Sequence, residues 1–512
     1  MSDWTGGYVA DIDYTYGYYQ ELNPLRVSLA FANAGLEVPE MGVACELGFG
    51  QGVSANVHAA ASVTRWHGTD FNPGQAAFAK ELAQASGSDA ALVDQSFAEY
   101  CQRDDLPDFD FIALHGIFSW ISDENRAIIV DFVRRKLKVG GVLYISYNAQ
   151  PGWAAMVPLR GLLTQYAEVM TAPGAGLPNR IGGALDFADK LLATNPAFAR
   201  ANPNVEARLK LLRGQNRNYV AHEYFNRDWQ PMTFADMAEM LGQAKMSFAC
   251  SAHYMDHIEA INLSAEQVAL LNEIGDPVFR QSTRDFMINQ QFRRDYWVKG
   301  ARRQNPLQRS EAIRRVRVVL VNTREKVELT VKGNMTEGKL NADVYGPLLD
   351  VMGDHVPRTL GELEAALQGK GINLTQILEA ALILSGKGDM APAQSQEAAK
   401  AALERTQRLN QKLFERVRSS DDVASLASPL TGGAVAAGRV TQLFLYAQTK
   451  GKRGSEAWAD FAWAILGAQG HRVMKDGATL QTAEENLAEL RKQAAEFETT
   501  RLPAFKALGI VS

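Results

Sequence analysis

The feature that most constrains this chain is the stretch from Ala44 to Gly52, which reads Ala-Cys-Glu-Leu-Gly-Phe-Gly-Gln-Gly. A mostly apolar run, 41–47, predicts a buried strand, and the glycines at every second position then predict a tight turn. Glycine has no Cβ, so the backbone can take positive φ there and approach a ligand closely. The segment 53–61 predicts a helix whose N-terminal N–H groups face the same space. Together they indicate a nucleotide-type site at the edge of a parallel sheet, with Glu46 placed to accept hydrogen bonds from a ligand amine or hydroxyl.

The spacing of the glycines distinguishes two kinds of nucleotide site. The dinucleotide fingerprint G-x-G-x-x-G needs its third glycine at position 53, where this chain has Val53. The pattern that begins at Glu46 is instead E-x-G-x-G-x-G, with Gly48, Gly50 and Gly52. It resembles motif I of class I S-adenosylmethionine-dependent methyltransferases. The resemblance implies S-adenosylmethionine as the cofactor, S-adenosylhomocysteine as its product, and these residues as its binding site. A turn that holds no ligand is the alternative for the glycines alone.

Two further predicted strands end in acids that are in register with the glycine turn. The strand 63–70 ends in Asp70, about 20 residues past the turn, where an acid reaches ribose hydroxyls. The strand 90–94 ends in Asp94, and the resemblance implies that an acid here meets the adenine amino group. The resemblance also implies that the side chains that follow, Gln95, Ser96 and Phe97, adjoin the adenine ring. Either acid could instead cap a helix.

The next pair of predicted strands points to a further part of the site. The strand 109–114 is followed by His115 and Gly116, and a helix over about 123–137 leads to the strand 142–147. Ligands lie at the carboxyl ends of strands in doubly wound sheets, so His115, Gly116 and the turn after residue 147 are candidate site residues. A structural histidine is the alternative.

The turn after the fifth strand narrows the resemblance. It reads Ser-Tyr-Asn-Ala-Gln-Pro-Gly-Trp over 146–153, and so contains Asn148 and Trp153. With the His-Gly pair, the segment 118–120 and a cluster of early tyrosines, it resembles the methyltransferases that carry a methyltransferase regulatory domain. Their members include the rickettsial outer-membrane-protein lysine methyltransferases. The resemblance covers motif I through Trp153 well, continues loosely through 222–225 and 291–295, and then weakens.

The early tyrosines are Tyr8, Tyr14, Tyr16, Tyr18 and Tyr19. They form either a surface arm packed by its rings or a segment that folds over the cofactor and lends hydroxyls to the site. In the second case we expect Tyr16 to bind the cofactor and Tyr18 to act in catalysis.

Methyl transfer from a sulfonium is an in-line displacement that depends mainly on alignment. A lysine acceptor, with an ordinary pKa of about 10.4, must lose its proton, and burial beside a positive charge favours that loss. The resemblance therefore implies methylation of protein lysines, with His115 or Asn148 orienting the amine and Tyr18 and Trp153 completing the pocket. A small-molecule methyltransferase and a non-catalytic S-adenosylmethionine-binding regulatory protein are the alternatives.

The chain has 512 residues, enough for several domains. We predict an α/β fold with three domains. Residues 1–262 form a doubly wound, Rossmann-like methyltransferase domain with a helical insertion at about 155–220. Residues 263–395 form a middle or regulatory domain of α+β type, partly like a winged helix, and residues 396–512 form a helical C-terminal domain.

Composition limits the partners of the chain. A net charge of −5 and the lack of a dense basic helix argue against a nucleic-acid binder, which leaves a protein substrate as the favoured partner. A membrane-spanning helix needs about 18 consecutive apolar residues, and no apolar run in this sequence approaches that length. The start has no signal-peptide pattern, and the three cysteines are far apart without metal-site spacing, so we expect a cytoplasmic protein without a metal. A homodimer is possible.

Overall fold

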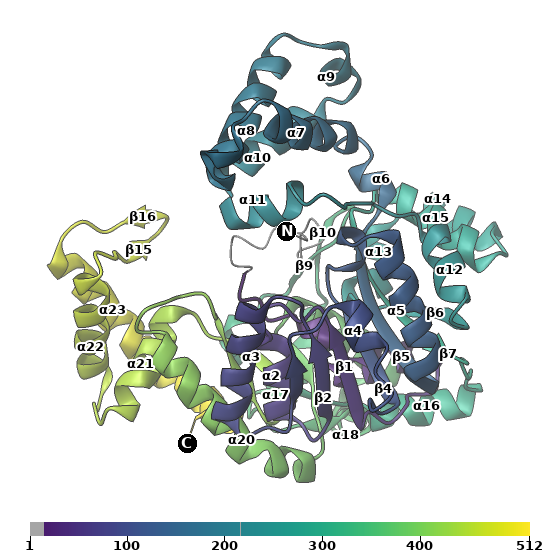
Figure 1. Cartoon of the computed structure of the whole chain (residues 1–512). Coiled ribbons are helices and arrows are strands. Elements are labelled where there is room, and N and C mark those ends of the chain that lie inside the picture. The colour runs from purple at the N-terminus through teal and green to yellow at the C-terminus, as the bar shows by residue number, and fades with distance from the viewer. Residues whose placement is uncertain (1–14, 216, 512) are drawn as a thin grey trace.

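The computed structural model describes residues 15–215 and 217–511, arranged around one central sheet (Figure 1). Tyr8 and Tyr14 lie outside the described residues. The strand order is β3-β2-β1-β4-β5-β7-β6, and the pairs among β1 to β5 are parallel. The strands are β1 Val43–Leu47, β2 Arg65–Thr69, β3 Ala91–Val93, β4 Phe109–Leu114, β5 Leu137–Asn148, β6 Met246–Ser251 and β7 Phe292–Lys299.

Helices cover both faces of this sheet, and this explains why its central strands are apolar. β1 is buried along its whole length, as expected for a parallel strand with helices on both sides. The strand order reverses between β1 and β4, so the carboxyl ends of these strands border a crevice. The predicted doubly wound, Rossmann-like sheet is confirmed. The helices that connect its strands are α2 Val53–Ala61, α3 Pro73–Ser86, α4 Phe97–Cys101 and α5 Asp123–Lys136.

The strand β7 was not predicted. It lies between β5 and β6 and is antiparallel to both, whereas β6 alone was expected to close the sheet. Its sequence lacks the apolar run of a typical buried strand, since it contains Arg293 and Asp295. Both side chains are buried and form an ion pair, with Nε and Oδ2 2.9 Å apart. The sheet therefore extends beyond residue 262 to Lys299, while the division into three domains stays a prediction.

The helical insertion rises above the carboxyl end of the sheet (Figure 1). It has a hydrophobic core of its own, in which Leu159, Leu163, Ile181, Leu185 and Leu209 are buried. Its helices after β5 form a lobe of their own (Figure 1), close to the predicted range. They are α6 Gln150–Trp153, α7 Val157–Val169, α8 Leu177–Ala193, α9 Ala197–Ala201, α10 Asn204–Gly214 and α11 Arg217–Tyr224.

The middle of the chain combines helices with short strands. A three-stranded sheet has the order β11-β8-β12, and β9 pairs with β10. One hydrophobic cluster joins Val142 and Tyr296 of the central sheet to Leu348 and Ile377 of this region. The elements are α12 Phe234–Gly242, α13 Glu259–Asn262, α14 Ala265–Glu273, α15 Pro277–Met287, α16 Pro306–Arg315, β8 Arg317–Leu320, β9 Thr330–Lys332, β10 Glu337–Lys339, α17 Ala342–Met352, β11 Arg358–Thr359, α18 Leu360–Leu367, α19 Leu374–Lys387 and β12 Met390–Pro392.

The C-terminal region is mostly helical. Its first helix packs along α2 and α3, and Leu409 and Leu413 share a hydrophobic cluster with Val57 and Leu82. Within the described ranges no helix is both long and apolar enough for a membrane span. The elements are α20 Gln396–Arg416, β13 Ser425–Ser428, β14 Gly433–Ala436, α21 Arg439–Thr449, α22 Ser455–Ala468, β15 Met474–Lys475, β16 Ala478–Thr479, α23 Ala483–Glu496 and α24 Leu502–Ala507; the short α1, Val27–Ala34, precedes the first strand of the chain.

Candidate functional site

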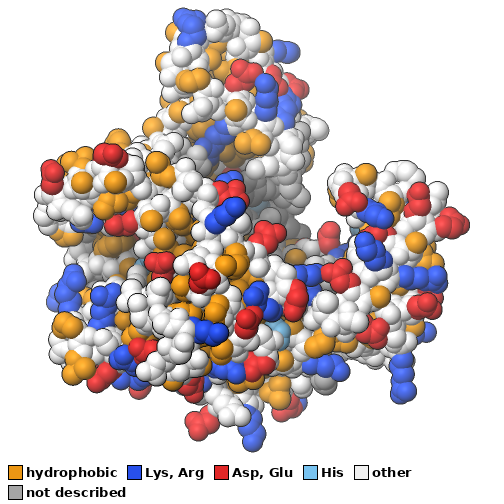
Figure 2. Space-filling view, turned by 180° about the vertical axis from the view of Figure 1, so that it is seen from behind, with side chains coloured by type: hydrophobic (Ala, Val, Ile, Leu, Met, Phe, Trp, Pro, Cys, Tyr) orange, Lys and Arg blue, Asp and Glu red, His pale blue; other side chains and the backbone are white. Residues whose placement is uncertain are grey.

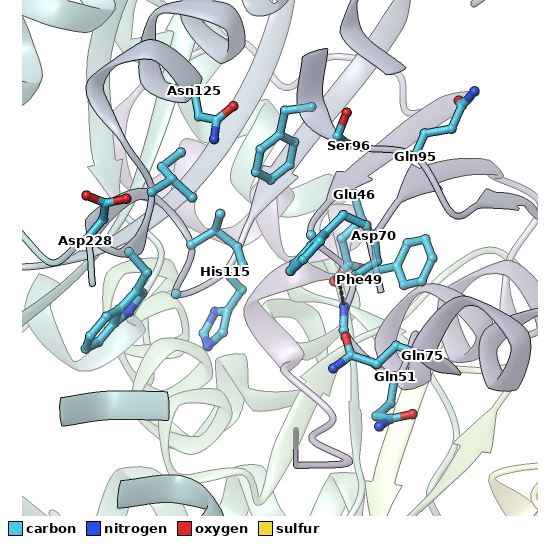
Figure 3. A pocket seen from close by; sticks show the side chains of 18 of the residues that line it. Glu46, Phe49, Gln51, Asp70, Gln75, Gln95, Ser96, His115, Asn125 and Asp228 are labelled. Atoms are coloured by element: carbon cyan, nitrogen blue, oxygen red, sulfur yellow. Dashed lines mark hydrogen bonds between the residues drawn. The ribbon is translucent and has the colours of Figure 1, made fainter. Parts of the chain in front are cut away.

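A cavity of about 330 Å³ lies at the carboxyl ends of β1, β2 and β4 (Figure 3). Its volume falls within the roughly 300–1,000 Å³ of small-molecule sites. Its walls come from the glycine turn, the ends of the parallel strands and the start of α5. The segments 15–19 and 227–228, far from these in sequence, complete it.

The glycine turn has the backbone that its sequence predicts. Gly48, Gly50 and Gly52 have φ of +73°, +56° and +68°, a region that favours glycine. A Cβ at Gly48 would lie 2.8 Å from Ile117 Cδ1, so no side chain fits there without displacing a cavity wall. Gly48 and Gly50 line the cavity. Gly52 does not: it precedes α2, and its close contact is with Ala79 of α3.

Glu46, at the end of β1, is the most unusual group in the cavity. Only 3% of the residue is exposed, and burial together with the charge of Asp70 raises the pKa of its carboxyl to about 8. Its Oε2 atom is buried without a hydrogen-bond partner among the residues that the structure describes. Such an atom costs free energy unless a ligand completes its hydrogen bonding.

Asp70, at the end of β2, is next to Glu46 in the cavity (Figure 3). Its Oδ2 accepts a hydrogen bond from the Gly50 N–H at 2.8 Å, and its Oδ1 accepts one from the Asn72 N–H at 3.0 Å. Burial raises the pKa of Asp70 to about 6, although both hydrogen bonds lower it. Asp70 therefore fixes the glycine turn in addition to facing the cavity.

The segment after β3 supplies another wall. Gln95, Ser96 and Phe97 line the cavity, as does Gly116 after β4. Ser96 also begins α4, since its Oγ accepts from the Glu99 N–H at 3.3 Å and its own N–H donates to the Glu99 carboxylate at 2.8 Å. This capping fixes the turn that carries the three side chains.

His115 lines the cavity and packs among aromatic rings. Its ring is stacked on that of Tyr19, with centroids 3.9 Å apart, and its Nδ1 lies 2.7 Å from the Tyr144 hydroxyl. Burial lowers the pKa of His115 to about 4, with Glu21 opposing and Arg294 assisting the shift. The imidazole is therefore neutral at pH 7.

Besides Gly52, two of the predicted cofactor residues lie outside the cavity lining. Asp94 does not line the cavity; its side chain is 48% exposed and pairs with Lys80, with Oδ1 and Nζ 2.8 Å apart. Tyr16 packs edge-on against Phe78, with ring centroids 5.1 Å apart, and the Arg416 guanidinium lies over its ring. Tyr16 points away because alternate residues of an extended segment face opposite sides, and Thr15 and Gly17 on either side of it line the cavity.

Three of the predicted catalytic residues also lie outside the cavity lining. Tyr18 accepts a hydrogen bond at its hydroxyl from the Ala434 N–H at 3.0 Å, in β14. Asn148 is buried, its backbone N–H donates to Ser119 Oγ at 2.9 Å, and its Nδ2 has no partner in the described part of the chain. Trp153 is buried in the core of the helical insertion, with the Arg208 guanidinium 3.9 Å from its ring centroid.

The cavity includes residues that were not assigned to the site. Phe49 and Ser54 adjoin the glycine turn, and their place there follows from motif I. Glu124 and Asn125 lie in the first turn of α5, which follows β4. Their position soon after the end of a parallel strand is the sequence signal that could have identified them. Asp228 follows the insertion, and nothing in its local sequence marks it. In Figure 3, Asn125 and Asp228 lie on the opposite side of His115 from Gln51 and Gln75.

The residues present fit S-adenosylmethionine. The unsatisfied Oε2 of Glu46 calls for a donor such as a ligand hydroxyl or amine, and Asp70 adds a second acceptor. The glycines leave room for close approach, and the N-terminus of α2 adjoins the turn. Within residues 15–215 and 217–511, no group of three or more His, Cys, Asp or Glu side chains could hold a metal ion.

The comparisons with known proteins agree with this fit. A model described as "Methyltransferase domain" matches residues 44–141, and one described as "Predicted methyltransferase regulatory domain" matches residues 216–299. An uncharacterized protein of Synechocystis is 38% identical over 512 residues, 99% of each chain. An uncharacterized protein of Rickettsia prowazekii is 24% identical over 294 residues, 55% of this chain and 51% of that protein.

Among solved structures, PKMT2 from Rickettsia typhi in complex with AdoHcy has a TM-score of 0.68. It is 16% identical, and the match covers 97% of this chain and 99% of that chain, so the two share a fold. The methyltransferase model spans the strand, turn and helix that build the cavity, and the Synechocystis protein matches from end to end. This chain therefore belongs to the S-adenosylmethionine-dependent methyltransferases that carry a methyltransferase regulatory domain, and S-adenosylmethionine is its cofactor.

Proposed function

We propose that this enzyme methylates lysine side-chain amines of a protein substrate by direct in-line transfer. The observation that carries the proposal is the chemistry of the cavity beyond His115, where Trp120, Glu124, Asn125 and Asp228 form the wall. The resemblance of the turn 146–153 to that of the rickettsial lysine methyltransferases supports it.

Acidic side chains favour a cationic acceptor. Glu124 and Asp228 attract an incoming ammonium group, and Arg227, 3.4 Å from Asp228, offsets part of that attraction. The indole of Trp120 offers an aromatic face, which also attracts an ammonium or a methylated ammonium group.

The inner end of the cavity favours the reactive form of the amine. S-adenosylmethionine, when bound, supplies an electrophilic methyl group on a positively charged sulfonium. Burial among His115, Tyr19 and Trp120 removes water from a lysine and lowers its pKa toward the neutral form. The neutral His115 adds no charge, and with Asn125 it can orient the nitrogen.

Within this proposal Glu46 and Asp70 hold the cofactor as hydrogen-bond acceptors, and the segment 95–97 adjoins its base. Asn148 and Trp153 lie outside the cavity lining and affect the acceptor wall only through the residues between them and the cavity. Trp229 connects Trp153 to Trp120, with ring centroids 5.2 and 5.9 Å away, so a change at Trp153 would reach the acceptor wall through packing.

The test is transfer of labelled methyl from S-adenosylmethionine to proteins of the source cell, with the modified residues found by mass spectrometry. Asp228→Asn and Glu124→Gln should raise the KM for the protein substrate several-fold and leave the Kd of S-adenosylhomocysteine unchanged. Asp89→Asn, an exposed acid away from the cavity, is the matched control. Label only in small molecules would refute the proposal, as would cofactor binding without any transfer.

A homodimer and a cytoplasmic location are parts of the same proposal. Exposed apolar side chains on the helical insertion support a partner surface, and Val169, Met170 and Leu211 are among them. Figure 2 shows hydrophobic side chains at the surface of this part of the molecule. The three cysteines are free and buried, which suits a reducing compartment. Light scattering of the purified chain, and of Met170→Lys with Leu211→Lys, tests the dimer.

A further inference from the structure

The segment 15–19, called the strap below, lies between the cofactor cavity and the C-terminal region. Thr15, Gly17 and Tyr19 line the cavity, whereas Tyr16 and Tyr18 contact other elements. This alternation is that of an extended chain, and Tyr19 has the extended φ and ψ of −114° and 107°. The strap thus has one side in the cofactor site and the other outside it.

On the cavity side, the strap is part of the wall. The Tyr19 N–H donates to Ser54 Oγ at 2.9 Å, and Ser54 belongs to α2 and also lines the cavity. The Tyr19 ring stacks on His115. A Cβ at Gly17 would lie 2.6 Å from the Tyr19 ring and hydroxyl, so the strap is closely folded on itself here. A displaced strap would therefore open the cavity.

On the other side, Tyr18 is held by the start of β14. Its hydroxyl accepts the Ala434 N–H, and a Cβ at Gly433 would lie 2.5 Å from the same hydroxyl. Two neighbours of the strap are bound to the turn that precedes β14. Asn23 Nδ2 donates to the Thr431 carbonyl at 3.0 Å, and His58 Nδ1 lies 3.1 Å from the Gly432 carbonyl.

Tyr16 is held by the end of α20. The Arg416 guanidinium lies 4.5 Å from the Tyr16 ring centroid and 4.6 Å from that of Phe78. Asp422 fixes this guanidinium through two hydrogen bonds, of 3.0 and 2.6 Å. A cation over aromatic faces in a partly desolvated setting is a favourable contact.

We propose that the C-terminal region positions the strap and thereby sets the affinity for the cofactor. Tyr18 and Arg416 are positioning residues in this arrangement, because Tyr18 ties the strap to β14 and Arg416 holds Tyr16 of the strap, and neither lines the cavity. The C-terminal region is then a structural part of the cofactor site, although its helices contribute no cavity wall among the described residues. The inference depends on the cofactor site and is independent of the acceptor.

The test uses the full chain with Tyr18→Phe and Arg416→Met, and titration with S-adenosylhomocysteine by calorimetry. Tyr18→Phe leaves the partly buried Ala434 N–H without this hydrogen bond and loosens the strap, so we expect the Kd to rise roughly 5- to 30-fold. We expect a smaller rise, roughly threefold, for Arg416→Met, which removes a cation–π contact. Hydrogen exchange of the peptide that contains the strap should become faster in both variants, while that of β1 and β4 stays slow.

Two matched controls separate positioning from general destabilisation. Tyr254→Phe removes another buried hydroxyl, which donates to the Arg26 carbonyl at 2.7 Å, and Arg408→Met removes another arginine of α20, paired with Glu404. Both should lower the midpoint of thermal unfolding without changing the Kd. Wild-type affinity in a folded Tyr18→Phe variant would overturn the proposal, and so would an equal loss in Tyr254→Phe.

Discussion

Glu46→Gln should make the cofactor-free protein more stable and at the same time weaken cofactor binding. Glutamine keeps the shape of the side chain and removes its ionisation. In the wild type, Glu46 is buried next to Asp70 and has an oxygen without a partner among the described residues. Such a carboxyl is costly to ionise, and only a bound ligand with a donor relieves that cost.

The magnitude follows from the raised pKa. Burial moves the pKa of Glu46 from 4.5 to about 8, so between these pH values the folded state holds a proton that the unfolded state has lost. Stability then falls as pH rises, by about 1.4 kcal/mol per pH unit, and the fall ends above the folded pKa. The wild type should lose about 3 kcal/mol between pH 6 and pH 9 through this group, and Glu46→Gln should not.

Urea denaturation of both proteins at pH 6, 7.5 and 9, without cofactor, gives this difference from the midpoints and the slope m. Calorimetric titration at pH 7.5 should give a Kd for S-adenosylhomocysteine roughly 10- to 100-fold higher in the variant, the loss expected for a hydrogen bond to a charged group. If the free energy of unfolding changed with pH in the same way in both proteins, the raised pKa of a buried Glu46 would be refuted. An unchanged Kd would refute its role in binding.

Three further outcomes are expected. Gly48→Ala should weaken cofactor binding by roughly tenfold or more, because the position has φ of +73° and a Cβ there would push Ile117 of the cavity wall, whereas Gly161→Ala, at an open position of α7, should bind normally in the same titration. Asp94→Asn should keep the Kd within about twofold, since exposed ion pairs contribute about 0–1 kcal/mol; a tenfold loss would return Asp94 to the site. Arg293→Met should destabilise the fold by roughly 3–5 kcal/mol in urea denaturation, because it leaves the buried carboxylates of Asp285 and Asp295 without their cation, and a change under 1 kcal/mol would contradict this.

The parallel part of the sheet was predictable because its signals are local. Apolar runs, the glycine turn and the strand-terminal acids each depend on a few neighbouring residues, and the first four strands match the predicted ranges within about two residues. β5 is the exception, because it begins at Leu137, well before the predicted start at residue 142. The position of Glu46, Asp70 and His115 at one cavity follows from the same logic, since carboxyl ends of parallel strands meet at one edge.

The remaining features depend on contacts between distant residues. The charged residues of β7 do not match the pattern of a buried strand, because the ion pairs that allow their burial form only in the folded protein. Asp228 reaches the cavity after a long helical insertion, and Tyr18 turns toward Ala434, far along the chain. The spacing of residues within a segment carries no information about such partners.

The place of β7 in the sheet has a consequence for synthesis of the protein. β5 pairs on one side with β4, which is made early, and on the other with β7, which is made only after the insertion and α12 to α15. At roughly 5–20 residues per second, the apolar edge of β5 waits on the order of ten seconds for its partner. An unpaired strand edge is prone to aggregation, so the nascent chain should depend on a chaperone until Lys299 has left the ribosome.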